Sequence, residues 1–340
     1  MTKRILITGG AGFIAHHFVE YLLKNTDWEI VTLDRLDFSG NLNRLYEVVT
    51  AQPNYKGRVS VVFHDLKGEI NPQIAVKIGA IDYVVHMAAG SHVDRSIQYP
   101  LEFVYDNVVG TANILEFSRR IDNLEKFVYF STDEVFGPAP DNIKYGEYDR
   151  YNSTNPYSAT KAGGEELTVA YENTYKLPAI ITHTMNVFGE RQHPEKYIPM
   201  CIKKIRDSER VTVHSDKHRV KAGSRHYIHA EDVSAAIYFL LTMKSIPEIN
   251  QYGLQKCQKY NIVGSEEINN LALAQMIADF QGKKLLYEMI DFHSSRPGHD
   301  LRYALDGSKM QRLGWTPSPV KDRLAQTVQW TLENDRWLKI

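Results

Sequence analysis

The chain has 340 residues, 43% of them hydrophobic, and a formal net charge of −1. The near-neutral charge gives no basic footprint for nucleic acid, and no apolar run reaches the length of a membrane span. Two cysteines are too few for a disulfide framework, and the thirteen histidines show no metal-ligand spacing. We therefore expect a cytoplasmic, globular α/β protein with no metal, no nucleic-acid partner and no membrane contact.

The first predicted strand, Arg4–Thr8, leads directly into a glycine-rich turn that contains Gly9 and Gly12. An amphipathic helix follows, beginning at Phe13 and Ile14. A strand, a glycine turn and a helix in this order are typical of a dinucleotide site. Gly9 would permit the tight turn, and Gly12 would let a pyrophosphate approach the amides of the first helical turn.

A second predicted strand, Glu29–Leu33, ends at Asp34, about twenty residues past the glycines, where a ribose-binding acid is expected. Its carboxylate would bind the ribose hydroxyls and repel a 2′-phosphate, which favours NAD over NADP. Arg35 leaves NADP open, because a guanidinium there could hold that phosphate. Asp65, after the strand Val59–Phe63, is a candidate for contact with the adenine, or else a turn residue.

Later strands alternate with helices over residues 1–185, which predicts a doubly wound, Rossmann-type parallel sheet that binds the dinucleotide. Residues 186–340 have longer, more charged loops and predict a smaller, partly interleaved substrate lobe, with a lone strand at Tyr260–Val263. His16 and His17 are expected on a solvated helix face. The further strands of the first part are Tyr83–His86, Lys126–Phe130 and Ala179–Thr182.

Tyr157 and Lys161 are four residues apart, so they lie one turn apart on the same helix face. There the ammonium can lower the pKa of the phenol and make the tyrosine a base for hydride chemistry at a carbinol carbon. Asp133 and Glu134 follow a predicted strand, and loops at the carboxyl ends of parallel strands line the ligand crevice. Simple alcohol oxidation does not need this second acid/base pair, so the sequence predicts oxidation combined with elimination.

The stretches Thr8–Ile14 and Tyr157–Lys161 together resemble the extended short-chain dehydrogenase/reductase superfamily. Further stretches resemble one branch of it, the nucleoside-diphosphate-sugar 4,6-dehydratases, over nearly the whole chain. The triplet Thr132–Glu134 is the most specific feature, because epimerases of the superfamily usually lack this acid pair. The stretches that carry the resemblance are Ser91–Ser96, Ser131–Val135, His193–Pro199 and Arg296–Asp300.

The resemblance implies a lyase with internal redox chemistry. Tyr157, polarised by Lys161, would take the proton of the sugar 4-hydroxyl while hydride leaves C4 for NAD, and Thr132 would hold the same oxygen. Glu134 would then remove the C5 proton, and Asp133 would protonate the departing 6-hydroxyl. Hydride would return to C6, which gives a 4-keto-6-deoxy sugar nucleotide and regenerates NAD.

The resemblance also implies further ligand contacts. Ala88 would contact the cofactor. Arginine suits bidentate contact with a diphosphate, although such residues are also common surface ion-pair partners, and Asn261 is equally suited to capping a turn. The candidates for substrate contact are Ser91, Asn186, Lys196, Arg225, Asn261 and Arg296.

The chain departs from dTDP-glucose members of the family at Gly90, where a glutamate is usual, at Met185 and Val187, and in a longer loop over 215–224. These positions are expected near the sugar or base. UDP-N-acetylglucosamine is therefore a candidate substrate beside UDP-glucose and dTDP-glucose, because the missing bulk at Gly90 could admit an N-acetyl group.

Other functions remain open from sequence. A dehydratase could stop at the 5,6-alkene by returning hydride to C4, and a 4-epimerase or a simple dehydrogenase would share the cofactor and the tyrosine–lysine pair. A non-catalytic NAD sensor would make that pair incidental. The family also implies a homodimer through helices around 108–119 and 157–171, with apolar surface from Ala112, Ile114, Leu115 and Leu167.

Overall fold

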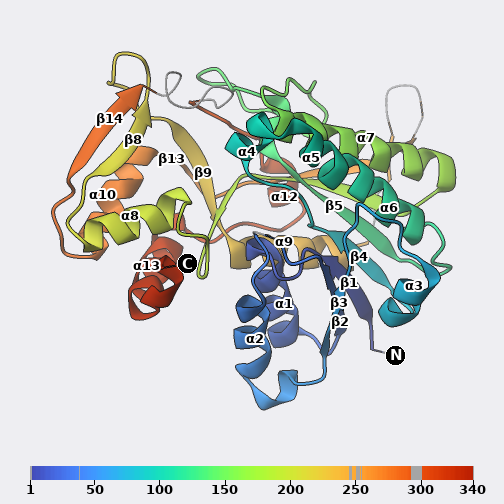
Figure 1. The fold of residues 1–340 in the computed structure, drawn as a ribbon. Helices are drawn as coiled ribbons and strands as arrows, with labels where there is room; N and C mark the ends of the chain where they lie inside the picture. Colours follow the sequence, from blue (N-terminus) through green and yellow to red (C-terminus); the bar gives the residue numbers. More distant parts are fainter. Residues whose placement is uncertain are drawn as a thin grey trace.

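A computed structural model describes residues 2–37, 39–244, 247–249, 253, 255–291 and 301–339. Figure 1 shows a larger part that contains the N-terminus and is built on a twisted sheet, with a smaller lobe beside it at the left. The last long helix of the chain lies in the smaller lobe.

The larger part is built on a seven-stranded sheet in which all neighbouring strands are parallel. The strand order is β12-β6-β5-β4-β1-β2-β3, and the direction of winding reverses between β1 and β4. This is the doubly wound, Rossmann-type sheet that the sequence predicts. The strands are β1 (Arg4–Thr8), β2 (Glu29–Asp34), β3 (Val59–Phe63), β4 (Tyr83–His86), β5 (Lys126–Thr132), β6 (Ala179–Thr184) and β12 (Gln258–Ile262).

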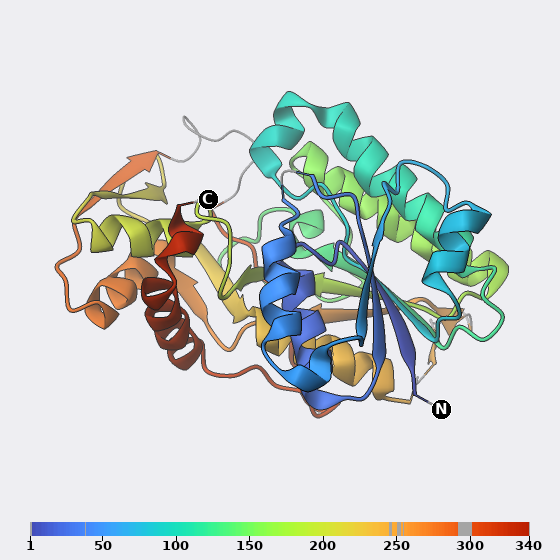
Figure 2. The same cartoon turned by 60° about the horizontal axis from the view of Figure 1, so that its bottom comes forward.

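Helices cover both faces of this sheet, because alternate strand residues point to opposite faces and both sets are apolar. Ile5 and Ile7 of β1 pack in one core with helices α1 and α9, whereas Leu6 packs in a second core with α6. Figure 2 shows the strands running between the two helical layers. The helices are α1 (Phe13–Asn25), α2 (Leu42–Thr50) and α9 (Ala230–Thr242) on one face, and α3 (Pro72–Ile78), α6 (Gly110–Ser118) and α7 (Pro156–Tyr175) on the other.

The strand expected alone in the smaller lobe at Tyr260–Val263 is instead β12, the edge strand of the main sheet. It pairs with β6, with Tyr260 opposite Thr182. Every residue of β12 is buried, as in a strand covered on both faces. The chain therefore returns to the first sheet after leaving it, and the division at residue 185 stays a prediction.

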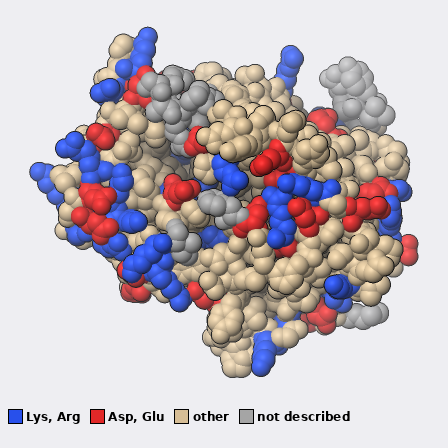
Figure 3. Space-filling model, viewed as in Figure 1, with Lys and Arg blue, Asp and Glu red and all other residues tan. Residues whose placement is uncertain are grey.

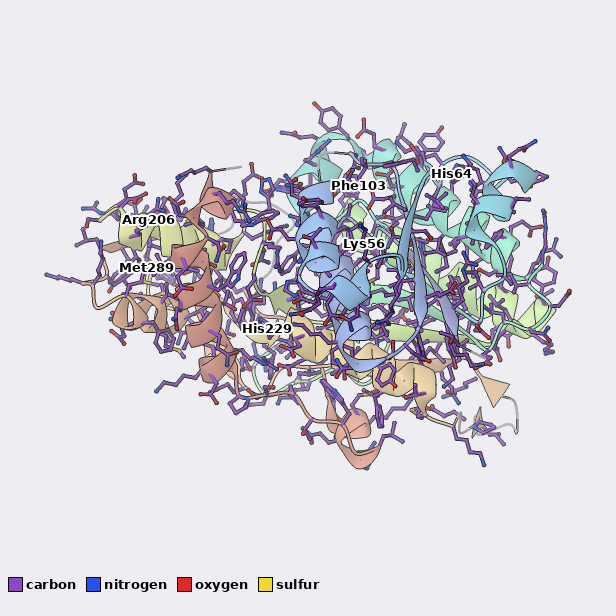
Figure 4. The ribbon with its side chains drawn as sticks, turned by 90° about the horizontal axis from the view of Figure 1, so that it is seen from below. Lys56, His64, Phe103, Arg206, His229 and Met289 are labelled. Atoms are coloured by element: carbon purple, nitrogen blue, oxygen red, sulfur yellow. The ribbon has the colours of Figure 1, made fainter. Side chains whose placement is uncertain are left out.

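The smaller lobe has its own apolar core, formed between three helices and two short sheets. In Figure 4, Arg206 and Met289 lie in this lobe, and His229 lies where it meets the larger part. The His229 ring packs edge-on against Phe188 of the lobe and His17 of α1. The elements are β7 (Asn186–Phe188), α8 (Tyr197–Arg206), β8 (Val211–Ser215), β9 (Ser224–His229), β13 (Glu267–Asn269), α10 (Asn270–Phe280), β14 (Tyr287–Asp291) and α13 (Val320–Glu333).

His16 and His17 are buried, contrary to the solvated face that the sequence suggests, because α9 and the chain around Glu190 cover this side of α1. The His17 ring nitrogen lies 2.9 Å from the Glu190 carbonyl oxygen. Burial lowers the pKa of both imidazoles, that of His17 to about 4. Both rings are therefore uncharged parts of the packing at neutral pH.

Shorter elements complete the described chain, in which no helix is both long and apolar enough to cross a membrane. Segment η2 is a π-helical turn between α5 and α6. These elements are η1 (Pro53–Tyr55), α4 (Val93–Gln98), α5 (Pro100–Val104), η2 (Tyr105–Val109), η3 (Asp133–Phe136), β10 (Glu248–Ile249), β11 (Gln255–Lys256), α12 (Ser308–Arg312) and η4 (Asp335–Leu338).

Candidate active site

The glycine turn between β1 and α1 has the close packing that only glycine allows. Gly9 has φ +74°, and a Cβ there would lie 2.9 Å from Ala88 Cα. A Cβ on Gly12 would lie 2.8 Å from the Gly9 carbonyl oxygen. Gly12 is the N-cap of α1 and brings no side chain to it, so the amides of Phe13 and Ile14, which have no partner within the helix, can receive a pyrophosphate.

Asp34 ends β2 beside this turn, and its carboxylate is held by backbone amides. Oδ2 accepts a hydrogen bond from Ala11 N (3.0 Å), and Oδ1 accepts one from Leu36 N (2.8 Å). Burial raises the pKa of Asp34, and the two amides oppose that shift. A fixed carboxylate at the end of β2, next to an uncovered helix N-terminus, fits the ribose and pyrophosphate of a dinucleotide.

Asp65 is less constrained. It lies in the turn after β3, where its Oδ1 accepts a hydrogen bond from Lys67 N (3.0 Å), and its side chain is 46% exposed. These contacts describe a turn residue at the surface. Its contact with the adenine stays a prediction.

Arg35 is the residue that made NADP a possible cofactor. Its guanidinium donates hydrogen bonds to two carboxylates of the protein. Its two terminal nitrogens donate to the two Asp106 oxygens (2.6 and 2.9 Å), and its Nε donates to Asp37 (2.9 Å). Donation of hydrogen bonds to Asp106 is the main cause of the raised pKa of Arg35. The guanidinium charge is therefore neutralised within the protein and is not presented to a 2′-phosphate.

The acid pair lies at the carboxyl end of β5, where the strand ends at Thr132 and η3 begins at Asp133. Thr132 Oγ1 donates to Asp133 Oδ1 (3.0 Å) and accepts from Glu134 N (3.3 Å). Asp133 is only 5% exposed, and its Oδ2 has no hydrogen-bond partner among the described residues. Burial and the neighbouring Glu134 charge raise the pKa of Asp133 to about 7. Asp133 thus keeps its proton toward neutral pH and can donate it.

Tyr157 and Lys161 lie in the first turns of α7, close to the acid pair. The Lys161 ammonium lies 4.3 Å from the centre of the Tyr129 ring, and burial lowers its pKa to about 7. The pKa of Tyr157 is raised, opposite to the shift that the sequence predicts, because burial and the Glu134 charge both disfavour the phenolate. Tyr157 in this environment therefore holds its proton firmly.

Comparisons with known proteins agree with this arrangement. The model of the GDP-mannose 4,6 dehydratase family matches residues 6–327. The low-salt glycan biosynthesis protein Agl12 of Haloferax volcanii is 38% identical over 334 residues, which cover 97% of this chain and 99% of that protein. The dTDP-glucose 4,6-dehydratase of Streptomyces venezuelae, solved with NAD and TYD bound, is 34% identical with a TM-score of 0.84, and 98% of each chain is covered.

The chain belongs to the nucleoside-diphosphate-sugar 4,6-dehydratases. It is an extended short-chain dehydrogenase/reductase, a hydro-lyase with internal redox chemistry that uses NAD, as the sequence predicts. Epimerases also have this fold. The UDP-glucuronic acid 4-epimerase of Bacillus cereus has a TM-score of 0.83 at 24% identity, covering 97% of this chain and 99% of its own.

A buried hydrogen-bonded chain behind the dehydratase's glycine turn was missed from sequence. Thr8 Oγ1 accepts from the amides of Met87 and Ala88, so its hydroxyl donates to His86 Nδ1 (2.7 Å). His86 Nε2–H then donates to Thr111 Oγ1 (3.0 Å), and burial lowers the pKa of His86 to about 3. These bonds hold Ala88 against Gly9. The available signal was a threonine and a histidine that end adjacent strands.

Of the predicted substrate residues, Arg225 is brought toward the acid pair. Burial and Glu134 raise the pKa of Asp133 and the Arg225 charge opposes them, so the guanidinium lies within electrostatic reach of Asp133. It lies 4.6 Å from the centre of the Tyr303 ring and donates to the Leu301 carbonyl oxygen (2.7 Å). On the face of the molecule that Figure 3 shows, acidic and basic side chains are intermixed.

The other substrate candidates are placed differently. Asn261 is fully buried in β12, and its amide bonds to His183 and to two backbone carbonyls, while its contact with substrate stays a prediction. Arg296 lies outside the described residues. Exposed side chains are found at Ser91 before α4, Asn186 at the start of β7 and Lys196 at the N-cap of α8, where substrate contact stays a prediction.

The local packing does not support the expected room at Gly90. A Cβ there would lie 3.1 Å from both Phe103 Cδ1 and Asp106 Oδ2, which is tighter than ordinary contact. The missing side chain thus points at α5 and η2. Met185 is 2% exposed and packs in a core with Phe136, so this departure also lies within the protein's interior.

Proposed function

We propose that this dehydratase converts a nucleoside-diphosphate hexose of gluco configuration into its 4-keto-6-deoxy derivative, with hydride returned to C6. The observation that carries the proposal is the buried Asp133 carboxyl, which keeps a proton toward neutral pH and has one oxygen unpaired within the described chain. An epimerase reaction would give such an acid nothing to protonate. Elimination of a poor leaving group such as hydroxide does require one.

In the first step, Tyr157 would accept the proton of the 4-hydroxyl. When bound, NAD would supply the hydride acceptor for C4 and the hydride donor for C6. Thr132 would hold the C4 oxygen, and the Lys161 ammonium would oppose the burial and Glu134 charge that keep Tyr157 protonated. Tyr157 and Lys161 would thus act as one unit.

In the second step, the 4-keto group acidifies the C5 proton, and Glu134 would remove it. Asn155 Nδ2 donates to Glu134 Oε2 (3.1 Å), which holds the carboxylate in place. Asp133 would give its proton to the 6-hydroxyl, which leaves as water. Two adjacent carboxyls with different environments can divide the acid and base roles in this way.

Glucose is the sugar we propose, because the packing at Gly90 gives no added room for an N-acetyl group. The relative from Streptomyces venezuelae is named for dTDP-glucose, and another relative, from Arabidopsis thaliana, for UDP-glucose. Thymidine and uridine diphosphates are therefore the two nucleotide carriers to compare. NAD would stay bound, since each turnover restores it.

The experiment is to incubate the purified protein, without added cofactor, with dTDP-glucose, UDP-glucose and UDP-N-acetylglucosamine in turn. Product mass should show the loss of one water from a glucose nucleotide, and deuterium supplied at C4 should be recovered at C6. Deuterium recovered at C4 with water lost would indicate a product that stops at the 5,6-alkene. Unchanged mass with inversion at C4 would indicate an epimerase and would overturn the proposal.

A further inference from the structure

A fully buried carboxylate, Glu165, lies on α7 behind the reacting side chains and has no part in the steps above. It follows Lys161 by four residues, so the two side chains lie one turn apart on the same helix face. Glu165 is 0% exposed and Lys161 is 3% exposed. Charges withdrawn from water interact strongly with their neighbours. The charge of Glu165 therefore directly affects the protonation of Lys161.

Hydrogen-bond donors from four separate segments hold Glu165 as a carboxylate. Its Oε1 accepts from Ser131 Oγ of β5 (2.5 Å). Its Oε2 accepts from Tyr151 Oη, from His183 Nε2 of β6 (3.1 Å) and from Lys259 Nζ of β12 (3.4 Å). Burial alone would raise the pKa of Glu165, but these partners bring it down to about 2. Glu165 is thus ionised throughout the working range of the protein.

His183 lies between two hydrogen-bond acceptors, Asn261 and Glu165. Asn261 Nδ2 donates to the carbonyl oxygens of Tyr145 and Asp306 (3.0 and 3.1 Å), so its Oδ1 is the atom that faces His183 Nδ1 at 3.0 Å. The other ring nitrogen, Nε2, faces a Glu165 oxygen. Each ring nitrogen therefore faces an oxygen to which it can donate, and the charge of His183 lowers the pKa of Glu165.

Lys161 has few charged neighbours to stabilise its ammonium. Among the described residues, the titratable groups found to interact with it are Glu165 on α7, Tyr129 on β5 and His86 on β4. Tyr157 precedes it by one turn on the same face of α7. Burial keeps Tyr129 protonated, and His86 is neutral, with its pKa lowered to about 3. Burial lowers the pKa of Lys161, and the Glu165 charge opposes that shift.

We propose that Glu165 is a positioning residue that keeps Lys161 charged while Tyr157 takes the C4 hydroxyl proton, and that the paired His183 moderates this effect. The inference rests on the proposed function, because it concerns the same C4 step. Two opposite consequences follow. Loss of the Glu165 charge should favour neutral Lys161, whereas loss of the His183 charge should favour the ammonium.

The test isolates C4 oxidation with a substrate analogue, the 6-deoxyglucose derivative of the nucleotide that the enzyme accepts. Its C4–H hydride passes to bound NAD and its 4-hydroxyl proton to Tyr157, but water cannot leave because there is no 6-hydroxyl. Bound NADH therefore accumulates, and its rate of formation is read by absorbance across neutral and alkaline pH. Neither Asp133 nor Glu134 is required for this readout.

In the parent enzyme the rate should fall as pH rises through the pKa of Lys161, because only the charged form supports Tyr157. Glu165→Gln should move this midpoint down by about one pH unit, and His183→Gln should move it up. Glu166→Gln is the matched control. It removes the next carboxylate of the same helix, which is exposed, and should leave the midpoint in place.

Midpoints that stay fixed, or that move in the same direction in both variants, would overturn the inference, since a merely structural role lowers the rate without opposite shifts. Glu165→Gln leaves buried cations unpaired and can fail to fold. In that case the inference is tested by the His183→Gln variant alone, whose pH midpoint should move up. A parent enzyme that forms no NADH would overturn the proposed function as well, whereas NADH formation with fixed midpoints overturns only the inference.

Discussion

At the scale of single residues, one physical cause accounts for both unusual groups in the site. Burial favours the uncharged form of any group, so it raises the pKa of the Asp133 acid and lowers that of the Lys161 amine, in each case to about 7. Small changes of charge nearby then decide which form is present. The site is therefore sensitive to substitutions that change charge without changing size.

Asp133 should reduce the stability of the folded protein at high pH. Its folded pKa of about 7 exceeds its unfolded value, so the folded state binds more protons and loses stability as pH rises toward 7. Asp133→Asn should unfold with a free energy about 2–4 kcal/mol higher than the parent at pH above 8, and with an equal value at acid pH below 4. Urea unfolding at the two pH values measures this. A constant difference between the two proteins would contradict the buried acid.

Substitutions in the acid pair and at the tyrosine should block different steps of the reaction. Glu134→Gln should oxidise C4 but not release the C5 proton, so bound NADH should accumulate when substrate is added. Tyr157→Phe should form no NADH, because the hydroxyl proton has no acceptor. Each change should lower the rate of water loss by about 10²- to 10⁴-fold. Absorbance of bound NADH distinguishes them, and identical behaviour would remove the separation of roles.

The choice of NAD over NADP should depend on Asp106 as well as Asp34. Asp106→Asn removes the carboxylate that accepts hydrogen bonds from both terminal nitrogens of Arg35. The guanidinium would still pair with Asp37 but would have lost Asp106, so it should bind a 2′-phosphate more readily and strengthen NADP binding relative to NAD by about three- to tenfold. Calorimetric titration of nucleotide-free protein measures the ratio. Adding Arg35→Ala should abolish the gain, and an unchanged ratio in Asp106→Asn would refute this role.

At the scale of helices and strands, the sequence predicts the sheet well because most of its strands are short, largely apolar runs. The predicted strand Arg4–Thr8 has the same limits as β1, and Glu29–Leu33 differs from β2 by one residue. The error at Tyr260–Val263 has a clear cause. A short apolar run shows that a strand is buried but does not show which sheet it joins.

The candidate site was predictable only where its chemistry is local. Tyr157 and Lys161 are four residues apart, and the glycine turn is continuous in sequence. The pair of Glu165 and His183 was not predictable, because it joins a helix to a strand and each residue alone resembles a structural one. His16 and His17 were misplaced because the covering helix α9 comes more than two hundred residues later.

At the scale of the whole molecule, the apolar surface differs from the one expected for a dimer. Ile114 and Leu115 are fully buried against the sheet, so they offer no surface to a partner. Exposed apolar side chains lie instead on the preceding segment from α4 to η2. They include Leu101 at 70% and Tyr105 at 54% exposure, with Ile97, Tyr99 and Val104 nearby in the chain. Such clusters are typical of protein interfaces.

We expect a homodimer that uses this segment. Leu101→Asp should convert the protein to a monomer at micromolar concentration, because a buried charge without a partner opposes association. Light scattering measures the mass, and Val76→Asp, at another exposed apolar position on α3, is the matched control. A parent protein with monomeric mass would refute the dimer, and a dimeric Leu101→Asp protein would place the interface elsewhere.

The pairing of β12 with β6 has a consequence for how the protein is made. β6 leaves the ribosome well before β12, and until β12 arrives its outer edge keeps unpaired N–H and C=O groups that other chains can bind. The sheet therefore becomes complete only after much of the smaller lobe has been synthesised. During that interval the nascent chain is exposed to aggregation. The lobe that would bind the sugar nucleotide thus also delays, and then completes, the closing of the sheet that would bind NAD.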